Sequence, residues 1–407
     1  MEILDILYIR MSTFLGLIKE IPDISVDRFD GENLNSSVYF LSHCHCDHMQ
    51  GLNYKFFEHL KQYNKYLYCT RISKAFLEAK YCNIETCVKD ITLDEKILIE
   101  YRSKNCDRRI DTFFVTCISA GHCPGSVMFL FEKMDKLVLY TGDFRINPKD
   151  YKKIASLHYR RDFNVFPKRF NKIYLDTTFL DPDFTFFPTR EESIKKICEI
   201  VNEWLEKSPR NVVVLECSAL YGSEFLYMEL SRFLNIPIHV KDRVYNSYCR
   251  IPDLKCHITN EPLVTRLHAC INKLDHSILE CRTDVLEKDI LIIVPSAQRW
   301  KGKDTSIVGE WNYYRERTFN VCYSAHASFD ELKKFIYYFK PEEIYPCVCP
   351  KGLEHKIFHL LDEIKNKVKE EKDMDENHKY MLQVLKPEAI NKPWIKYYYP
   401  DDNNDNS

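Results

Sequence analysis

One run of seven residues constrains the fold of this chain more than any other feature. Residues 42–48 read Ser-His-Cys-His-Cys-Asp-His, directly after the apolar run Val38–Leu41, which is typical of a buried strand. Side chains alternate along an extended chain, so His43, His45 and Asp47 leave this strand on one side, and the last histidine joins them if the chain turns. Three imidazoles and a carboxylate within six residues are a ligand mix that suits zinc or a similar divalent ion. The competing interpretation is a polar surface loop.

Composition limits the classes of protein that remain. The chain has 407 residues, 45% of them hydrophobic, which is enough for one large or two ordinary domains. Its 58 basic and 60 acidic residues leave a net charge of −2, so any surface for nucleic acid must be local. The 17 cysteines are scattered, and neither a signal peptide nor an apolar run of membrane-spanning length is present. We therefore expect reduced thiols and a cytosolic or nuclear protein.

Metal-competent side chains recur where other predicted strands end. The run 112–118 leads to His122 in a Gly- and Pro-rich loop, 137–140 leads to Asp143, and 172–175 leads to Asp176. A later strand, 319–324, delivers His326. Strand 24–26 ends at Asp27, for which a turn residue and a hydrogen-bond partner of the histidines both remain open, the turn being favoured. If these strand ends share one rim, the side chains form a single site.

The ligand types suggest that different residues have different roles at this site. A carboxylate can bridge two ions because it has two oxygens, and two ions about 3.5–4 Å apart stabilise both oxygens of a phosphoryl displacement. Water bound to such an ion ionises near neutral pH, so the expected chemistry is hydrolysis. Asp176 is better suited to orienting an imidazole than to binding an ion. We expect His43, His45 and His122 to bind one ion, and Asp47 and His48 to bind a second. Asp143 would bridge the two ions, and His326 would complete the set of ligands.

From Thr189 onwards, predicted helices alternate with strands, which indicates an α/β layer arrangement. This part of the chain contains a second group of ligand types, His239, His268, Cys270 and Cys281. Two imidazoles and two thiolates would make a structural zinc site. Buried free thiols are the competing interpretation, since the chain is rich in cysteine.

Five segments together carry a resemblance to a known family. Residues 42–48, 120–126, 140–144, 174–179 and 322–328 resemble the motifs of metallo-β-lactamase-fold nucleases that carry an inserted β-CASP domain. The resemblance covers about residues 11–365 and implies an α/β fold, a metallo-β-lactamase αββα sandwich with an inserted α/β β-CASP domain. The implied divisions are an N-terminal extension (1–10), the first part of the metallo-β-lactamase domain (11–181), the β-CASP domain (182–317), the returning segment of the metallo-β-lactamase domain (318–370) and a charged tail (371–407).

The resemblance also assigns residues. It implies Zn²⁺ or Mg²⁺, as one or two ions, at the active site and a structural Zn²⁺ in the β-CASP domain. In the zinc site Cys281 is the natural fourth ligand, although its distance from Cys270 in the sequence is shorter than in the family pattern. The implied active-site ligands are His43, His45, Asp47, His48, His122, Asp143 and His326. The implied catalytic residues are Asp27, Asp47, His48, Asp143, Asp176 and His326, and the structural zinc positions are His239, His268, Cys270 and Cys281.

The implied activity is that of a DNA endonuclease with 5′–3′ exonuclease activity, acting on hairpins and overhangs in double-strand-break repair by non-homologous end joining. Ser223 stands where exonuclease relatives place a lysine, and Val348 stands where RNA-cleaving relatives place a histidine. Both departures favour the DNA end-processing branch. The alternatives are an RNA-processing nuclease of the same fold and a non-catalytic DNA-end scaffold.

The resemblance implies partners and location as well. We expect a nuclear monomer that binds DNA ends, hairpins and overhangs and does not bind membranes. Protein partners in the family are DNA-dependent protein kinase and the end-joining ligase complex. These partners bind the long C-terminal region of the family's nucleases. Transfer of these protein partners to this chain is the weakest of the implications, because the sequence stops at Ser407.

Overall fold

The computed structural model describes residues 12–102, 110–217, 222–270 and 279–374, and it contains two compact units. The first unit comprises residues 1–74, 83–180 and 326–407, and the second comprises 75–82 and 181–325. The predicted N-terminal extension and residues 375–407 of the predicted tail lie outside the described residues. No described helix is both long and apolar enough to cross a membrane.

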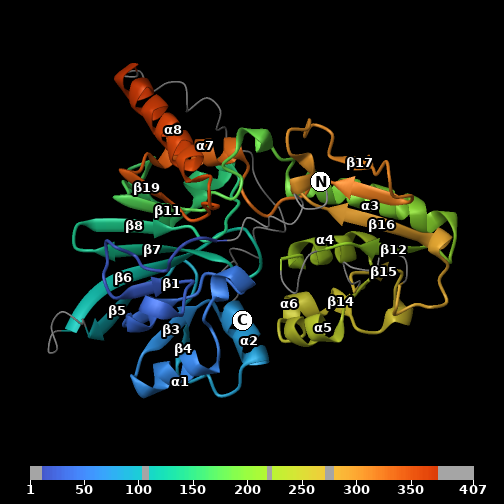
Figure 1. Cartoon of the computed structure of the whole chain (residues 1–407), viewed down its shortest axis with the longest axis horizontal. Helices are drawn as coiled ribbons and strands as arrows, with labels where there is room; N and C mark the ends of the chain where they lie inside the picture. The colour runs from blue at the N-terminus through green and yellow to red at the C-terminus, as the bar shows by residue number, and fades with distance from the viewer. Residues whose placement is uncertain (1–11, 103–109, 218–221, 271–278, 375–407) are drawn as a thin grey trace. The chain divides into compact units, whose positions relative to one another are not determined.

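Two sheets form the centre of the first unit (Figure 1). One sheet is wholly parallel and has the order β1-β2-β3-β4. The other has the order β19-β11-β8-β7-β6-β5, antiparallel from β5 to β8 and parallel from β8 to β19. The strands are β1 (Ile24–Val26), β2 (Val38–Phe40), β3 (Tyr66–Cys69), β4 (Val88–Asp90), β5 (Lys96–Arg102), β6 (Ile110–Ser119), β7 (Val127–Lys133), β8 (Lys136–Tyr140), β11 (Lys172–Leu175) and β19 (Glu343–Pro346).

Alternation along β7 shows how the layers pack. Phe129 belongs to the core between the two sheets, where its ring centroid lies 5.1 Å from that of Phe40. Met128 and Leu130 belong to a second core on the opposite face, together with Phe335 of α7 (Phe329–Phe339). A strand segment with both faces buried must be apolar, and residues 127–131 of β7 are fully buried and apolar.

Helices cover the outer face of each sheet. Phe56 of α1 (Tyr54–Gln62) packs on Tyr39 of β2 at 5.0 Å between ring centroids, while α7 and α8 (Glu354–Met374) cover the outer face of the other sheet. These four layers confirm the predicted αββα sandwich. Shorter elements of this unit are η2 (Gly31–Asn35), η3 (Cys46–Met49), η4 (Pro148–Lys153), η5 (Ala155–Leu157) and the separate hairpin β9 (His158–Arg161) and β10 (Asn164–Pro167).

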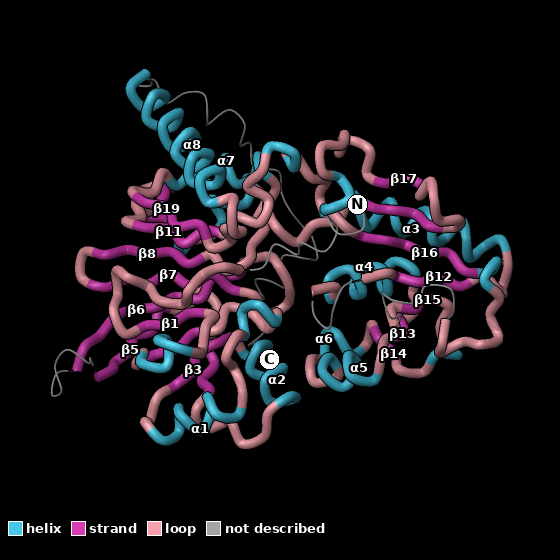
Figure 2. Tube along the Cα trace, viewed as in Figure 1, coloured by secondary structure: helices cyan, strands magenta, loops and turns pink. Residues whose placement is uncertain are grey.

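The second unit is built on one seven-stranded sheet with the order β14-β13-β15-β12-β16-β18-β17, parallel except for β17 (Figure 2). Its strands are β12 (Val212–Leu215), β13 (Ile238–His239), β14 (Ile258–Thr259), β15 (Leu267–His268), β16 (Ile290–Pro295), β17 (Gly309–Trp311) and β18 (Thr318–Val321). Its longer helices are α3 (Arg190–Lys207), α4 (Glu224–Leu234), α5 (Asp242–Tyr248) and α6 (Pro252–Lys255), with short turns η6 (Pro182–Phe184), η7 (Pro262–Val264), η8 (Glu287–Asp289) and η9 (Gln298–Trp300).

The point at which the chain returns to the first unit differs from the sequence-based expectation. Residues 318–325 were assigned to the returning segment, but β18 pairs with β16, with Thr318 opposite Ile292. This strand therefore belongs to the sheet of the second unit, and the returning segment begins at His326. A capping box formed by Ser328 and Glu331 follows at once and starts α7.

Candidate metal centres

Strand ends from both sheets of the first unit bring histidines and carboxylates together. Oδ2 of Asp143, after β8, lies 3.5 Å from Nε2 of His43, 3.6 Å from Nε2 of His122 and 3.8 Å from Nε2 of His326. Its other oxygen, Oδ1, lies 3.1 Å from Nε2 of His48. Two ligands that each lie about 2.1 Å from one ion are separated by roughly 3–4 Å, so these spacings fit ligands of shared ions.

The remaining predicted residues also lie in the first unit. His45 belongs to the group formed by His43, His122 and Asp143. Asp47 lies at the margin, with Oδ2 3.7 Å from Nε2 of His48, and it accepts a hydrogen bond from the backbone of Ser12. Asp27 and Asp176 lie behind the histidines. Their roles as ligands or catalytic groups remain predictions.

A change of backbone conformation places the last histidine of the 42–48 run. His45 is extended, and the next four residues form the short helix η3, whose start is marked by a hydrogen bond from His48 N to His45 O at 3.1 Å. The turn that the sequence analysis required is therefore present. Without it, His48 would leave the strand on the face opposite to His43.

Gly142, next to Asp143, has a backbone that other residues rarely adopt. Its φ is +52°, and a Cβ atom there would lie 3.0 Å from Ser42 Oγ. Both the left-handed conformation and the close approach of two loops favour glycine at this position. Glycine at position 142 is thus a geometric requirement of placing Asp143.

Asp27 organises the back of the site through four hydrogen bonds. It accepts from Ser42 N at 2.7 Å, from Ser42 Oγ, from His48 Nδ1 at 2.7 Å and from Tyr140 Oη at 2.8 Å. Ser42 has one hydroxyl proton, which Asp27 accepts, so its oxygen accepts from His43 Nδ1 at 2.9 Å. These hydrogen bonds are made at Nδ1, so Nε2 of His43 and Nε2 of His48 face the cluster and are the atoms that would bind an ion. Asp176 orients His326 in the same way at 2.8 Å.

The sequence-based preference for Asp27 as a simple turn residue was incomplete. Asp27 has the left-handed φ of +55° expected of a turn, but its side chain is buried and carries the hydrogen bonds described above. Ser42 and Tyr140 were not identified as functional residues. The signal that could have found Tyr140 is alternation along β8, which directs it to the same side as Val138, between the sheets.

We expect Asp27→Ala to be strongly destabilising even without metal. The change leaves a buried amide and three buried side-chain donors without their acceptor, and such losses cost on the order of 3–5 kcal/mol together. Denaturant unfolding in a chelating buffer measures this cost. Asp135→Ala, at an exposed turn, is the matched control, and a cost for Asp27→Ala equal to that of the control would contradict the assigned role.

Electrostatics favour a cation in the cluster. Burial alone would lower the pKa of His48, but Asp143 and Asp27 raise it well above its ordinary value. Burial would likewise lower the pKa of His326, and Asp176 and Asp143 raise it to about 9. Burial and His43 lower the pKa of His45, so that imidazole stays neutral. A site that attracts protons through buried carboxylates, and also holds neutral imidazoles, is suited to a divalent ion.

Buried nitrogen atoms provide a further test of fit. Within the part of the chain that is described, Nε2 of His43 and Nε2 of His45 are buried and make no hydrogen bond. Such a group costs free energy unless something else satisfies it. The residues present therefore fit an ion with nitrogen and oxygen ligands.

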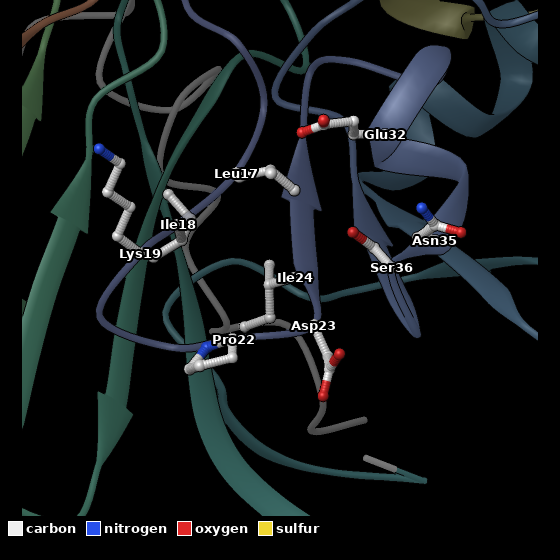
Figure 3. A pocket seen from close by; sticks show the side chains of 9 residues that line it. All are labelled: Leu17, Ile18, Lys19, Pro22, Asp23, Ile24, Glu32, Asn35 and Ser36. Carbon is white, nitrogen blue, oxygen red and sulfur yellow. The ribbon is translucent and has the colours of Figure 1, made fainter. Parts of the chain in front are cut away.

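A surface pocket in the same unit is chemically different. Its volume is about 460 Å³, and Leu17, Ile18 and Pro22 line it together with the acidic residues Asp23 and Glu32 (Figure 3). No member of the histidine cluster lines it. We therefore do not assign the candidate chemistry to this pocket.

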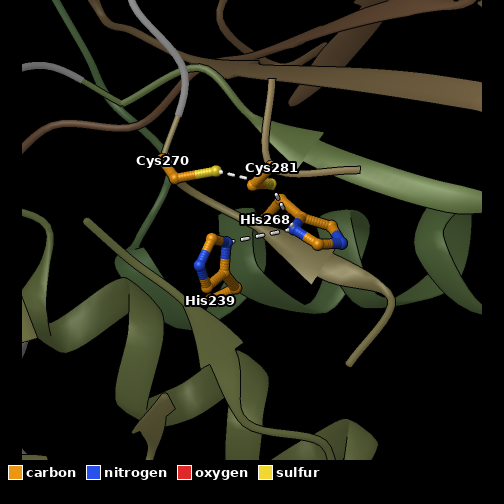
Figure 4. A group of neighbouring side chains, drawn as sticks. All are labelled: His239, His268, Cys270 and Cys281. Atoms are coloured by element: carbon orange, nitrogen blue, oxygen red, sulfur yellow. Dashed lines mark hydrogen bonds between the residues drawn. The ribbon is translucent and has the colours of Figure 1, made fainter. Parts of the chain in front are cut away.

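The second predicted cluster is also assembled. Sγ of Cys270 lies 3.3 Å from Sγ of Cys281, which lies 3.4 Å from Nδ1 of His268, and Nδ1 of His268 lies 3.2 Å from Nδ1 of His239 (Figure 4). One ligand atom from each residue lies within 4.8 Å of every other. Neighbouring parallel strands β13 and β15 place the two histidines side by side. Cys281 occupies the fourth position despite its short distance from Cys270 in the sequence.

Comparisons with known proteins agree with this architecture. Residues 252–352 match the family model described as DNA repair metallo-beta-lactamase. This chain is 37% identical over 354 residues to "Protein artemis" of Danio rerio. The aligned region covers 84% of this chain and 54% of the relative. The chain is therefore similar to DNA repair metallo-beta-lactamase proteins over these regions. Its similarity to artemis proteins confirms the resemblance inferred from the motifs.

Two other relatives show the breadth of the family. The human "Protein artemis" is 35% identical over 354 residues, covering 84% of this chain and 50% of the relative. "DNA cross-link repair protein SNM1" of Arabidopsis thaliana is 26% identical over 325 residues, covering 77% of this chain and 61% of the relative. The chain spans about half the length of the artemis proteins that it matches.

Proposed function

We propose that this chain is a metal-dependent DNA nuclease that hydrolyses phosphodiesters at DNA ends, hairpins and overhangs in double-strand-break repair. The observation that carries the proposal is the convergence of three imidazoles on the carboxylate of Asp143 from separate parts of the chain. The match of residues 252–352 to a DNA repair family model and the similarity to artemis proteins support DNA as the substrate. Non-homologous end joining and a nuclear location belong to the same proposal.

The residues of the chain have separate tasks in this proposal. His43, His45 and His122 hold one ion with Asp143, whose second oxygen faces His48. Asp27 fixes the ring of His48 and Asp176 fixes the ring of His326, so both imidazoles keep Nδ1 protonated. A divalent ion bound there would supply Lewis acidity, which makes water nucleophilic near neutral pH and stabilises charge on the phosphoryl oxygens. Cleavage would leave a 5′-phosphate and a 3′-hydroxyl.

The second cluster has a structural task in the same proposal. His239, His268, Cys270 and Cys281 would hold a Zn²⁺ with all four positions taken, which leaves no position for substrate. The identity of this unit as a β-CASP domain, and DNA-dependent protein kinase and the end-joining ligase complex as partners, are carried over from the resemblance.

Substrate preference tests the proposal against the RNA-processing alternative. The full chain, loaded with Mg²⁺ or Mn²⁺, should cleave hairpin DNA and DNA overhangs in preference to single-stranded RNA of matched sequence. We expect a preference of tenfold or more, about 1.4 kcal/mol of differential transition-state binding. Faster cleavage of the RNA would overturn the DNA assignment while leaving the hydrolytic site intact.

A further inference from the structure

A buried ion pair connects the loop that carries Asp143 to the start of α7, the helix that follows His326. Nε of Arg145 donates to Oε1 and Oε2 of Glu331, at 3.2 Å each, and Nη2 donates to Oε1 at 3.2 Å. The side chains of Arg145 and Glu331 are only 6% and 17% exposed. Burying such charges is costly unless they are paired, so each residue depends on the other.

The two residues of the pair lie close in the sequence to two candidate metal ligands. Arg145 follows Asp143 by two residues, and Glu331 is the third residue of α7, five residues after His326. Glu331 Oε2 also accepts a hydrogen bond from Ser328 N at 2.7 Å, which completes the capping box of α7. One carboxylate therefore connects the Asp143 loop to the start of the helix that follows His326.

Backbone hydrogen bonds extend this connection to a third loop. Ala327 N donates to Phe144 O at 3.0 Å, and Arg145 N donates to Ala120 O at 3.0 Å. Ala120 begins the loop that carries His122. The loops of His122, Asp143 and His326 are thus joined at their bases, and the ion pair is the charged, side-chain part of that junction.

We propose that Arg145 and Glu331 are positioning residues, which hold His326 and the Asp143 loop where they can share one ion. This inference rests on the metal-binding part of the proposed function and is independent of the substrate. Groups that orient ligands without touching the ion typically change metal affinity or activity by about 10–100-fold when they are removed.

The experiment measures Mn²⁺ affinity by calorimetry on the full chain after removal of bound metal. Arg145→Met and Glu331→Gln should each weaken the affinity of the Asp143 site about 10–100-fold. Glu331→Gln keeps an oxygen that can accept from Ser328 N, so it separates loss of the ion pair from loss of the helix cap. Arg145→Lys, which keeps the charge but not the two-oxygen geometry, should give an intermediate affinity.

Lys172→Met is the matched control. Lys172 pairs with Glu20 at 2.9 Å and is similarly buried, but it starts β11, at the end of the strand away from Asp176. Arg145→Met and Glu331→Gln could lower the thermal midpoint by as much as Lys172→Met does and still bind Mn²⁺ as tightly as Lys172→Met. In that case the pair is merely structural and the proposal is overturned. If only Glu331→Gln folds, its affinity alone decides. A wild-type chain that binds Mn²⁺ but cleaves no DNA would contradict the proposed function and leave this test intact.

Discussion

Asp143→Asn should abolish DNA cleavage while leaving DNA binding in place. The carboxylate oxygens of Asp143 lie 3.1–3.8 Å from the Nε2 atoms of four imidazoles, and the amide removes both the negative charge and one of the two acceptor oxygens. Loss of preorganised electrostatic stabilisation of this kind lowers the rate by about a thousandfold or more. Single-turnover cleavage of a hairpin substrate in Mg²⁺ measures the rate, and fluorescence anisotropy on the same DNA measures the binding.

The control for this prediction is Asp135→Asn, which makes the same chemical change at an exposed turn. The control should cleave like the wild type. Cleavage by Asp143→Asn at the rate of the control would mean that the histidine cluster has no part in hydrolysis. The chain would then be better described as a scaffold for DNA ends.

Cys281→Ser should remove one equivalent of bound zinc and destabilise the second unit. Serine is a poor zinc ligand at neutral pH, and the energy of binding a structural zinc is part of the energy of folding. An ion present at about a thousand times its dissociation constant contributes about 4 kcal/mol. This loss lowers the unfolding midpoint by roughly 10 °C in a unit of this size.

Elemental analysis and thermal unfolding test this prediction together. Cys256→Ser, at an exposed thiol of the same unit, is the control and should keep both the zinc and the midpoint. A strong chelator should lower the midpoint of the wild type to that of Cys281→Ser. Full zinc content and an unchanged midpoint in Cys281→Ser would show that the four residues are a buried thiol and imidazole cluster without an ion.

Much of the site could be predicted because its residues follow strands. Apolar runs end in His43, Asp143 and Asp176, and parallel strands that end at one rim bring such residues together. The contact between Asp27 and Tyr140 could not be predicted, because Tyr140 comes from the other sheet and meets Asp27 only when the sheets stack. Packing between sheets leaves little trace in local sequence patterns.

The boundary between the two units near residue 318 was not predicted correctly, for a related reason. Strand 318–321 alternates polar and apolar residues and could join either sheet, and only its pairing with β16 decides the question. Such pairing joins segments that are distant in the sequence, so local patterns cannot assign it. By contrast, the capping boxes at Thr189 and Ser328 are local, so the sequence alone carries their pattern.

Anomalous X-ray scattering from crystals grown with Zn²⁺ and Mn²⁺ tests the central claim most directly. We predict anomalous peaks about 2.0–2.3 Å from imidazole nitrogens of His43 and His122 and from the carboxylate of Asp143, and a further zinc peak among His239, His268, Cys270 and Cys281. A map with no peak beside Asp143, in a chain that still cleaves DNA, would contradict the account.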